Sequence, residues 1–140
     1  MVERAGSSVD FVTAACVTYL PSQRCLRWAY AGHPPALWLD DGTELIAPRQ
    51  GIPLGLQDTA SFAEGVHRAA APTGVLLYTD GLTEARHAGH AFGQAPVTAA
   101  LGELHNPTPQ QAVARLRARV TAFADAPLTD DLCLLAARVA

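Results

Sequence analysis

Two groups of carboxylates stand where the sequence predicts strand ends. Asp80 follows an apolar run at 75–78 and precedes Gly81, whereas Asp130 and Asp131 come directly before an apolar run at 132–139. If these two strands are neighbours in one sheet, their acids converge at one rim, and carboxylate oxygens suit a hard divalent cation such as Mg²⁺ or Mn²⁺. Each group also has a plain structural explanation, as a turn or as a solvated loop. Spacing alone leaves both interpretations open.

The histidines are weaker candidates for chemistry. His87 and His90 are separated by Ala88 and Gly89, and no cysteine or acid stands at zinc-site spacing beside them, so we predict an exposed loop. His33 lies in a Gly-His-Pro-Pro stretch whose prolines restrict the backbone, which favours a turn histidine. The histidines therefore predict no metal centre of their own.

Short β-rich segments dominate the first half of the chain. Segments 11–20, 25–31, 36–39 and 43–46 are rich in β-branched and aromatic residues and are separated by turn residues, which predicts a β-meander. A weaker strand is expected at 62–67, and the apolar runs at 75–78 and 132–139 read as strands, the first of them buried on both faces. The cysteines at 16, 25 and 133 lie in these segments and are expected to be small core residues.

Helices are predicted only in the second half. One covers about 95–104, and another begins at Thr108, where a capping hydroxyl is followed by proline and then by Gln111. On this second helix the apolar stripe is expected to face the core and the arginines at 115 and 119 to face solvent; the stripe consists of Val113, Leu116, Val120 and Phe123. The order of elements predicts an α+β fold in one unit over 10–140, preceded by a disordered or linker segment at 1–9.

Composition limits the classes of function. With 140 residues, 49% of them hydrophobic and a net charge of −3, the chain can form a compact core but lacks the concentrated basic surface that nucleic acid requires. No apolar run reaches the length of a membrane span, and the N-terminal residues do not resemble a signal peptide. We therefore expect a cytoplasmic protein with no nucleic-acid or membrane partner.

Seven segments, taken in order, resemble the SpoIIE/RsbU-like branch of the metal-dependent PPM-type serine/threonine phosphatases. They extend from Phe11 almost to the end of the chain: 11–14, 31–35, 41–42, 53–56, 78–85, 92–93 and 130–132. The resemblance implies a mostly antiparallel β-sandwich flanked by helices, with a two-metal Mn²⁺ or Mg²⁺ site at one end. It also implies hydrolysis of phosphoserine or phosphothreonine by a metal-held water, and in bacteria the typical substrate is a phosphorylated anti-sigma-factor antagonist.

The resemblance assigns roles residue by residue. Asp80 corresponds to a metal ligand at a strand end, and Asp130 to another before the last strand, with Asp131 as its neighbouring candidate. Gly81 would allow another group to come close to the backbone. The loop of Gly32 and His33 would be structural or would face the substrate.

The chain resembles only the C-terminal portion of that domain. Family members carry an Asp-x-x-Gly-His-Gly stretch, with an aspartate that bridges both metals, before the segment that corresponds to Phe11, and no such stretch occurs here. The resemblance therefore implies an incomplete metal site and exposed strand surface that a second copy or a complementing N-terminal segment could cover. Two alternatives to a working phosphatase stay open, namely a degenerate module that binds the phosphoprotein without hydrolysis and a fragment of a longer gene product.

Overall fold

The computed structural model describes residues 11–125 and 131–139, so the predicted linker at 1–9 and the candidate ligand Asp130 lie outside the described residues. Within these ranges the chain forms strands, two α-helices and two short 3₁₀ helices. In chain order they are β1 (Ala14–Leu20), η1 (Pro21–Gln23), β2 (Cys25–Ala31), β3 (Leu37–Trp38), β4 (Gly65–Arg68), β5 (Thr73–Tyr78), η2 (Asp80–Leu82), β6 (Arg86–His87), β7 (His90–Ala91), α1 (Gln94–Gly102), α2 (Pro109–Phe123) and β8 (Leu134–Val139).

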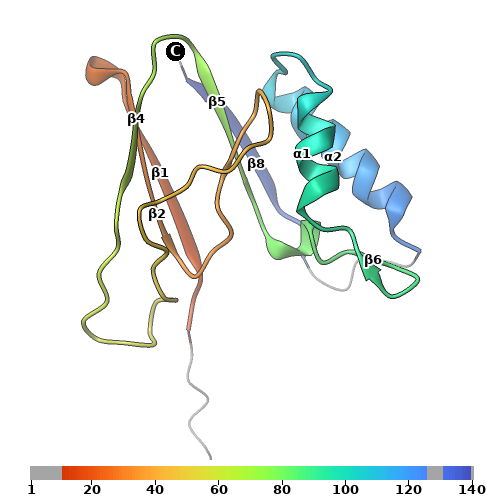
Figure 1. The fold of residues 1–140 in the computed structure, drawn as a ribbon, viewed down its shortest axis with the longest axis horizontal. Coiled ribbons are helices and arrows are strands. Elements are labelled where there is room, and N and C mark those ends of the chain that lie inside the picture. The colour runs from red at the N-terminus through yellow and green to blue at the C-terminus, as the bar shows by residue number, and fades with distance from the viewer. Residues whose placement is uncertain (1–10, 126–130, 140) are drawn as a thin grey trace, which may run out of the picture.

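The strands form two three-stranded antiparallel sheets and a small hairpin. One sheet has the order β1-β2-β4, the other has the order β3-β5-β8, and β6 pairs with β7. Figure 1 shows the β1-β2-β4 sheet on one side, the β3-β5-β8 sheet in the middle and the two helices on the other side. This α+β arrangement of antiparallel sheets with flanking helices confirms the predicted fold class.

Two hydrophobic clusters hold these layers together. Trp28 and Tyr30 belong to the cluster between the sheets, and Leu76 and Leu116 belong to the cluster between the middle sheet and the helices. The middle sheet is therefore covered on both faces, which explains why β5 has a continuous apolar sequence instead of an alternating one.

The predicted β-meander is wrong, because β3 leaves the sheet of β1 and β2. Leu37 pairs with Leu76 of β5, and segment 43–46 contributes only an isolated bridge between Leu37 and Glu44. The Gly-His-Pro-Pro turn after β2 carries the chain across to the other layer, where Leu37 is fully buried. Pairing with a strand some forty residues further along the chain leaves no local signal in the sequence.

Helix α2 begins as predicted. The Thr108 hydroxyl accepts a hydrogen bond from the Gln111 amide (3.2 Å), and the Gln111 side chain accepts one from the Thr108 amide (2.8 Å). Leu116 and Val120 are buried, as the predicted stripe requires, whereas Val113 is only half-buried.

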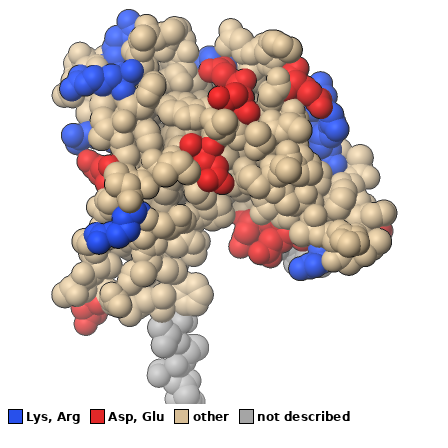
Figure 2. All heavy atoms as spheres, viewed as in Figure 1, with Lys and Arg blue, Asp and Glu red and all other residues tan. Residues whose placement is uncertain are grey.

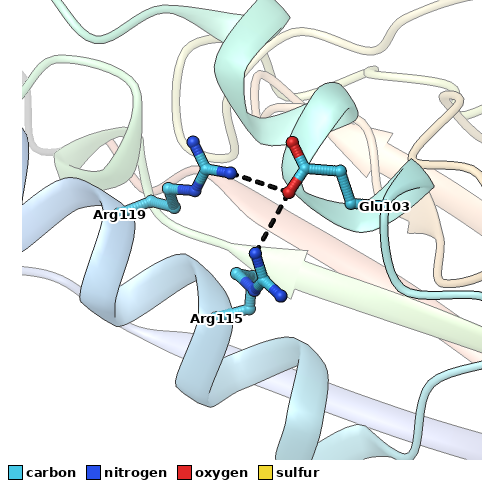
Figure 3. Close-up of polar contacts among 3 residues, drawn as sticks. All are labelled: Glu103, Arg115 and Arg119. Atoms are coloured by element: carbon cyan, nitrogen blue, oxygen red, sulfur yellow. Dashed lines mark hydrogen bonds and ion pairs between the residues drawn. The ribbon is translucent and has the colours of Figure 1, made fainter.

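The two predicted solvent-facing arginines connect α2 to the end of α1. Arg115 and Arg119 both donate to one carboxylate oxygen of Glu103, at 3.0 and 2.7 Å (Figure 3). All three side chains are substantially exposed, so this ion-paired cluster contributes little to the free energy of folding.

The cysteine prediction is correct for Cys25, which is buried, and wrong for Cys16 and Cys133, which are exposed. Strand alternation explains Cys16, because its neighbours Ala15 and Val17 pack against the core between the sheets and Cys16 points away from it. All three thiols are free.

The surface carries charges of both signs. On the face seen in Figure 2, arginines lie among aspartates and glutamates instead of gathering into one basic patch. None of the helices in the described ranges is long and apolar enough to cross a membrane.

Candidate metal centre

Thr79, the residue directly after β5, joins the end of that strand to the segment before β8. The Thr79 hydroxyl donates to the Asp131 carbonyl oxygen (2.7 Å) and accepts from the Cys133 amide (2.9 Å). The Thr79 amide also donates to the Cys133 carbonyl oxygen (3.1 Å), which continues the β5–β8 pairing beyond the strands. The two acid-bearing segments therefore lie side by side at one end of the middle sheet.

Asp80 begins η2 directly after this joint. Its carbonyl oxygen accepts from the amides of Thr83 (2.9 Å) and Glu84 (2.8 Å), which closes the turn. Asp80 itself is exposed, so its carboxylate is accessible at this end of the sheet. Gly81 is buried inside η2 and has an ordinary φ, so the turn does not depend on the positive φ that glycine permits.

Asp131 is also exposed at this end, and Asp130 lies outside the described residues. Within 11–125 and 131–139, no group of three or more His, Cys, Asp or Glu side chains could hold a metal ion. Carboxylate oxygens are the donors that Mn²⁺ and Mg²⁺ prefer, so Asp80 and Asp131 are of the right chemical kind and would supply part of a ligand set for such an ion.

Behind the acids, a partly buried hydrogen bond joins β5 to α1. The Tyr78 hydroxyl donates to the Gln94 side-chain oxygen (2.9 Å) at the first turn of α1. Burial raises the pKa of Tyr78 to about 12, with a smaller contribution in the same direction from the negative charge of Glu44. Tyr78 thus stays a neutral donor at physiological pH and supports the end of β5.

The loop of Gly32 and His33 is built as a tight structural turn. Gly32 has a φ of +65°, and a Cβ atom there would lie 2.4 Å from the Pro53 ring, so only glycine fits. The His33 Nδ1–H donates to the Pro34 carbonyl oxygen (2.9 Å), and Gln50 donates to the His33 carbonyl oxygen (2.8 Å). These contacts connect the loop to segment 50–53.

The segment with His87 and His90 is exposed, as predicted, but forms the β6–β7 hairpin instead of a loop. Ala88 and Gly89 both have positive φ, as a two-residue hairpin turn of this hand requires. The Asp125 carboxylate accepts from the Ala88 amide (2.9 Å) and lies 3.7 Å from His87 Nδ1. The hairpin is thereby fastened to the end of α2.

The whole chain, residues 1–140, matches the family described as Stage II sporulation protein E (SpoIIE). The chain belongs to the SpoIIE family. No curated protein matches it.

Two solved structures share the fold of this SpoIIE-family chain. The SpoIIE phosphatase domain of Bacillus subtilis, from a Mn-presoaked sample, superposes with a TM-score of 0.69 at 12% identity, over 91% of this chain and 56% of that one. The SiaA PP2C domain of Pseudomonas aeruginosa superposes with a TM-score of 0.63 at 24% identity, over 84% and 48%. The chain thus spans about half the length of each and shares their fold over that span.

Sequence reasoning missed Thr79, the residue that brings the two acidic segments of this SpoIIE-family chain together. A threonine between a buried strand and an aspartate is the available signal, since its hydroxyl can both donate and accept. The site-residue assignments themselves stay predictions.

Proposed function

We propose that this chain carries the strand-end ligands of a Mn²⁺- or Mg²⁺-dependent phosphatase that hydrolyses phosphoserine or phosphothreonine in a protein. The observation that supports it most directly is the Thr79 joint, which places Asp80 and Asp131 at the same end of one sheet. Membership of the SpoIIE family supports the phosphatase class.

Asp80 and Asp130 would hold the metal, with Asp131 beside them. A bound divalent ion supplies a more acidic water and neutralises charge on phosphoryl oxygens. The chain's own contribution would be to fix the backbone that carries the carboxylates: the η2 turn closes on the Asp80 carbonyl oxygen, and Thr79 donates to the Asp131 carbonyl oxygen. The exposure of both aspartates leaves room for a protein-bound phosphate.

The proposed substrate is a phosphorylated anti-sigma-factor antagonist in the cytoplasm, which is what the family resemblance implies. A second candidate function is binding of the same phosphoprotein without hydrolysis. It is favoured by the sequence, in which the family's Asp-x-x-Gly-His-Gly stretch has no counterpart.

The test is Mn²⁺-dependent phosphate release from a phosphoserine protein by the wild type, Asp80→Asn and Asp130→Asn. Asp58→Asn, which removes an exposed carboxylate in another loop, is the matched control. We expect the wild type and the control to release phosphate at one rate, and both ligand variants to be slower by at least about tenfold.

Equal rates in all four proteins, above a protein-free blank, would refute the ligand roles. No release from any of them, together with retained binding of the phosphoprotein, would favour the binding module.

A further inference from the structure

A polar pocket of about 230 Å³ lies in the segment between β3 and β4. Two stretches of that segment line it, 49–52 and 57–61, and their polar side chains there include Arg49, Gln57, Thr59 and Ser61. Pockets that enclose a whole small molecule or cofactor usually measure about 300 Å³ or more. This pocket is therefore sized for one functional group of a larger molecule.

The end of β2 holds the two stretches in place. The Gly51 amide donates to the Tyr30 carbonyl oxygen (3.1 Å), and the Gly51 carbonyl oxygen accepts from the Gly32 amide (2.7 Å). The Phe62 ring lies so close to Gly51 that a Cβ atom there would be 2.3 Å from the ring. This contact fixes the neighbouring Ser61 beside the first stretch. The pocket is therefore preformed by backbone bonds and packing.

Arg49 gives the pocket a positive charge that no carboxylate neutralises. Its guanidinium donates to the Ser61 hydroxyl oxygen (2.8 Å), and among the described residues it forms no ion pair. Asp58 is the one acid in segment 49–61, and it is not among the lining residues. Four other arginines do pair with acids, namely Arg27, Arg115, Arg119 and Arg138. The pocket is therefore cationic in a chain whose net charge is −3.

Further hydrogen-bond donors surround this charge. Because the Ser61 hydroxyl oxygen accepts from Arg49, its own proton is available to a ligand. The side chains of Gln57 and Thr59 form no hydrogen bond within the part of the chain that the structure describes. A guanidinium binds carboxylate and phosphoryl oxygens with two parallel hydrogen bonds, and hydroxyl and amide donors can complete such a site. The pocket therefore has the chemistry of an oxyanion site.

The pocket lies at the same end of the molecule as the candidate metal centre. Figure 1 shows segment 49–61, in olive, at the lower end of the β1-β2-β4 sheet, and η2, in green, at the lower end of the middle sheet. Gly51 bonds the last residues of β2, and Asp80 lies two residues beyond β5, so each site continues from a strand end. A protein docked across this end would meet both sites at once.

We propose that this pocket, the Arg49 pocket, binds an oxyanion of the phosphoprotein substrate, either a carboxylate or a second phosphoryl group, in addition to the phosphoryl group that is hydrolysed. The assignment to the substrate rests on the proposed function, whereas the binding of an oxyanion does not. A substrate held at two points docks in one orientation. Arg49 thus contributes to the choice of substrate and not to the chemical step.

Oxyanion binding is tested by NMR on the 140-residue chain without added metal, with inorganic phosphate and acetate as probes. The Ser61 amide and the Arg49 side-chain Nε–H report on the pocket, and chloride at equal ionic strength is the control. We expect saturable shifts with an oxyanion and none with chloride. Saturation by phosphate alone would identify a phosphoryl ligand, and saturation by acetate at similar concentrations a carboxylate. No saturable shift with either probe, or an equal one with chloride, would overturn the proposal.

A matched pair of variants locates the binding. Arg49→Gln should weaken it at least about tenfold, followed at the Ser61 amide, because a charged donor is lost. Arg68→Gln removes an exposed arginine of β4 that is not among the lining residues and should leave binding unchanged. Thermal unfolding checks that both variants fold. Equal affinity in the two variants would place the oxyanion elsewhere and overturn the proposal.

Kinetics test the assignment to the substrate. With a phosphoserine protein, Arg49→Gln should raise KM about tenfold with a much smaller change in kcat, and Arg68→Gln should change neither. An unchanged KM in Arg49→Gln, together with oxyanion binding by the wild type, would overturn this assignment. Failure of the wild type to release phosphate would instead count against the proposed function, and the oxyanion binding measured by NMR would stand.

Discussion

At the scale of single residues, the candidate site depends on a side chain that has no acid–base role. The Thr79 hydroxyl satisfies one acceptor and one donor on the chain before β8, and its amide adds a third bond to the same segment. The aspartates can bind a shared ion only if their backbones are held in one place. In the proposed site Thr79 would therefore be a positioning residue, and the contribution of its hydrogen bonds can be measured through stability.

Thr79→Val keeps the shape of the side chain and removes the hydroxyl. The Asp131 carbonyl and the Cys133 amide would each lose a partner, so we expect the free energy of unfolding to fall by about 1–3 kcal/mol. Urea unfolding followed by tryptophan fluorescence measures the change. Thr18→Val, at an exposed position of β1, is the matched control and should change stability by less than about 0.5 kcal/mol. Equal losses of unfolding free energy in the two variants would show that the Thr79 hydrogen bonds contribute no more to stability than an exposed threonine hydroxyl does.

At the scale of elements, local chemistry predicts some parts well. Strand β2 has the predicted bounds, because turn residues delimit it on both sides. The start of α2 is also as predicted, because a capping box involves only residues three apart. These features depend on neighbours along the chain.

Other elements have no local signal. The assignment of β3 to the middle sheet depends on its pairing with β5 and on the burial of Leu37, both of which involve distant residues. The β6–β7 hairpin turns at Ala88, a residue type that seldom has a positive φ, so its turn could not be predicted from residue preference. The sequence predicts that the acid-bearing segments at 80 and 131 lie together only if their two strands are neighbours. The pairing of β5 with β8 is seen only in the structure.

The capping box of α2 leads to a testable prediction about the stability of this helix. Thr108→Ala would remove the acceptor for the Gln111 amide and should lower stability by about 1 kcal/mol, seen as a melting temperature lower by about 2–4 °C. Thr108→Ser should retain most of the stability, because serine caps equally well. Thr121→Ala, at an exposed position in the last turn of the same helix, controls for losing a threonine hydroxyl. A shift as large at Thr121 as at Thr108 would contradict the capping role.

At the scale of the whole molecule, each of the two packed interiors contains a buried tyrosine. Tyr30 is 2% exposed between the sheets, and Tyr78 is 4% exposed between the middle sheet and the helices. Burial raises the pKa of Tyr30 to about 12, opposed by the hydrogen bond from the Ala36 amide and helped by the charge of Glu44. Burial likewise raises the pKa of Tyr78 to about 12. The packing on both faces of the middle sheet is thus expected to lose stability over the same alkaline pH range.

The direction of that pH dependence follows from the two pKa values. Below pH about 10 these tyrosines are protonated in both the folded and the unfolded chain, so they add no pH dependence. As the pH rises from about 10 to about 12, the unfolded chain loses protons that the folded chain keeps. The free energy of unfolding should then fall by up to about 1.4 kcal/mol per pH unit for each tyrosine. The chain contains no lysine, and arginine stays charged in this range, so no other basic side chain obscures the effect.

Tyr78→Phe separates the contribution of Tyr78 to this pH dependence from that of Tyr30. The variant loses the hydrogen bond to Gln94 at every pH, so its stability is lower throughout, but it has only one buried tyrosine left to titrate. Urea unfolding at pH about 9 and about 11 should therefore show a decline about half as steep as in the wild type. An equally steep decline would mean that Tyr78 does not stay neutral when folded, and that the interface between the middle sheet and the helices admits water or charge at the end of β5. Because Asp80 lies only two residues beyond that strand end, the same measurement reports how firmly the packing beneath the candidate metal centre holds the end of β5.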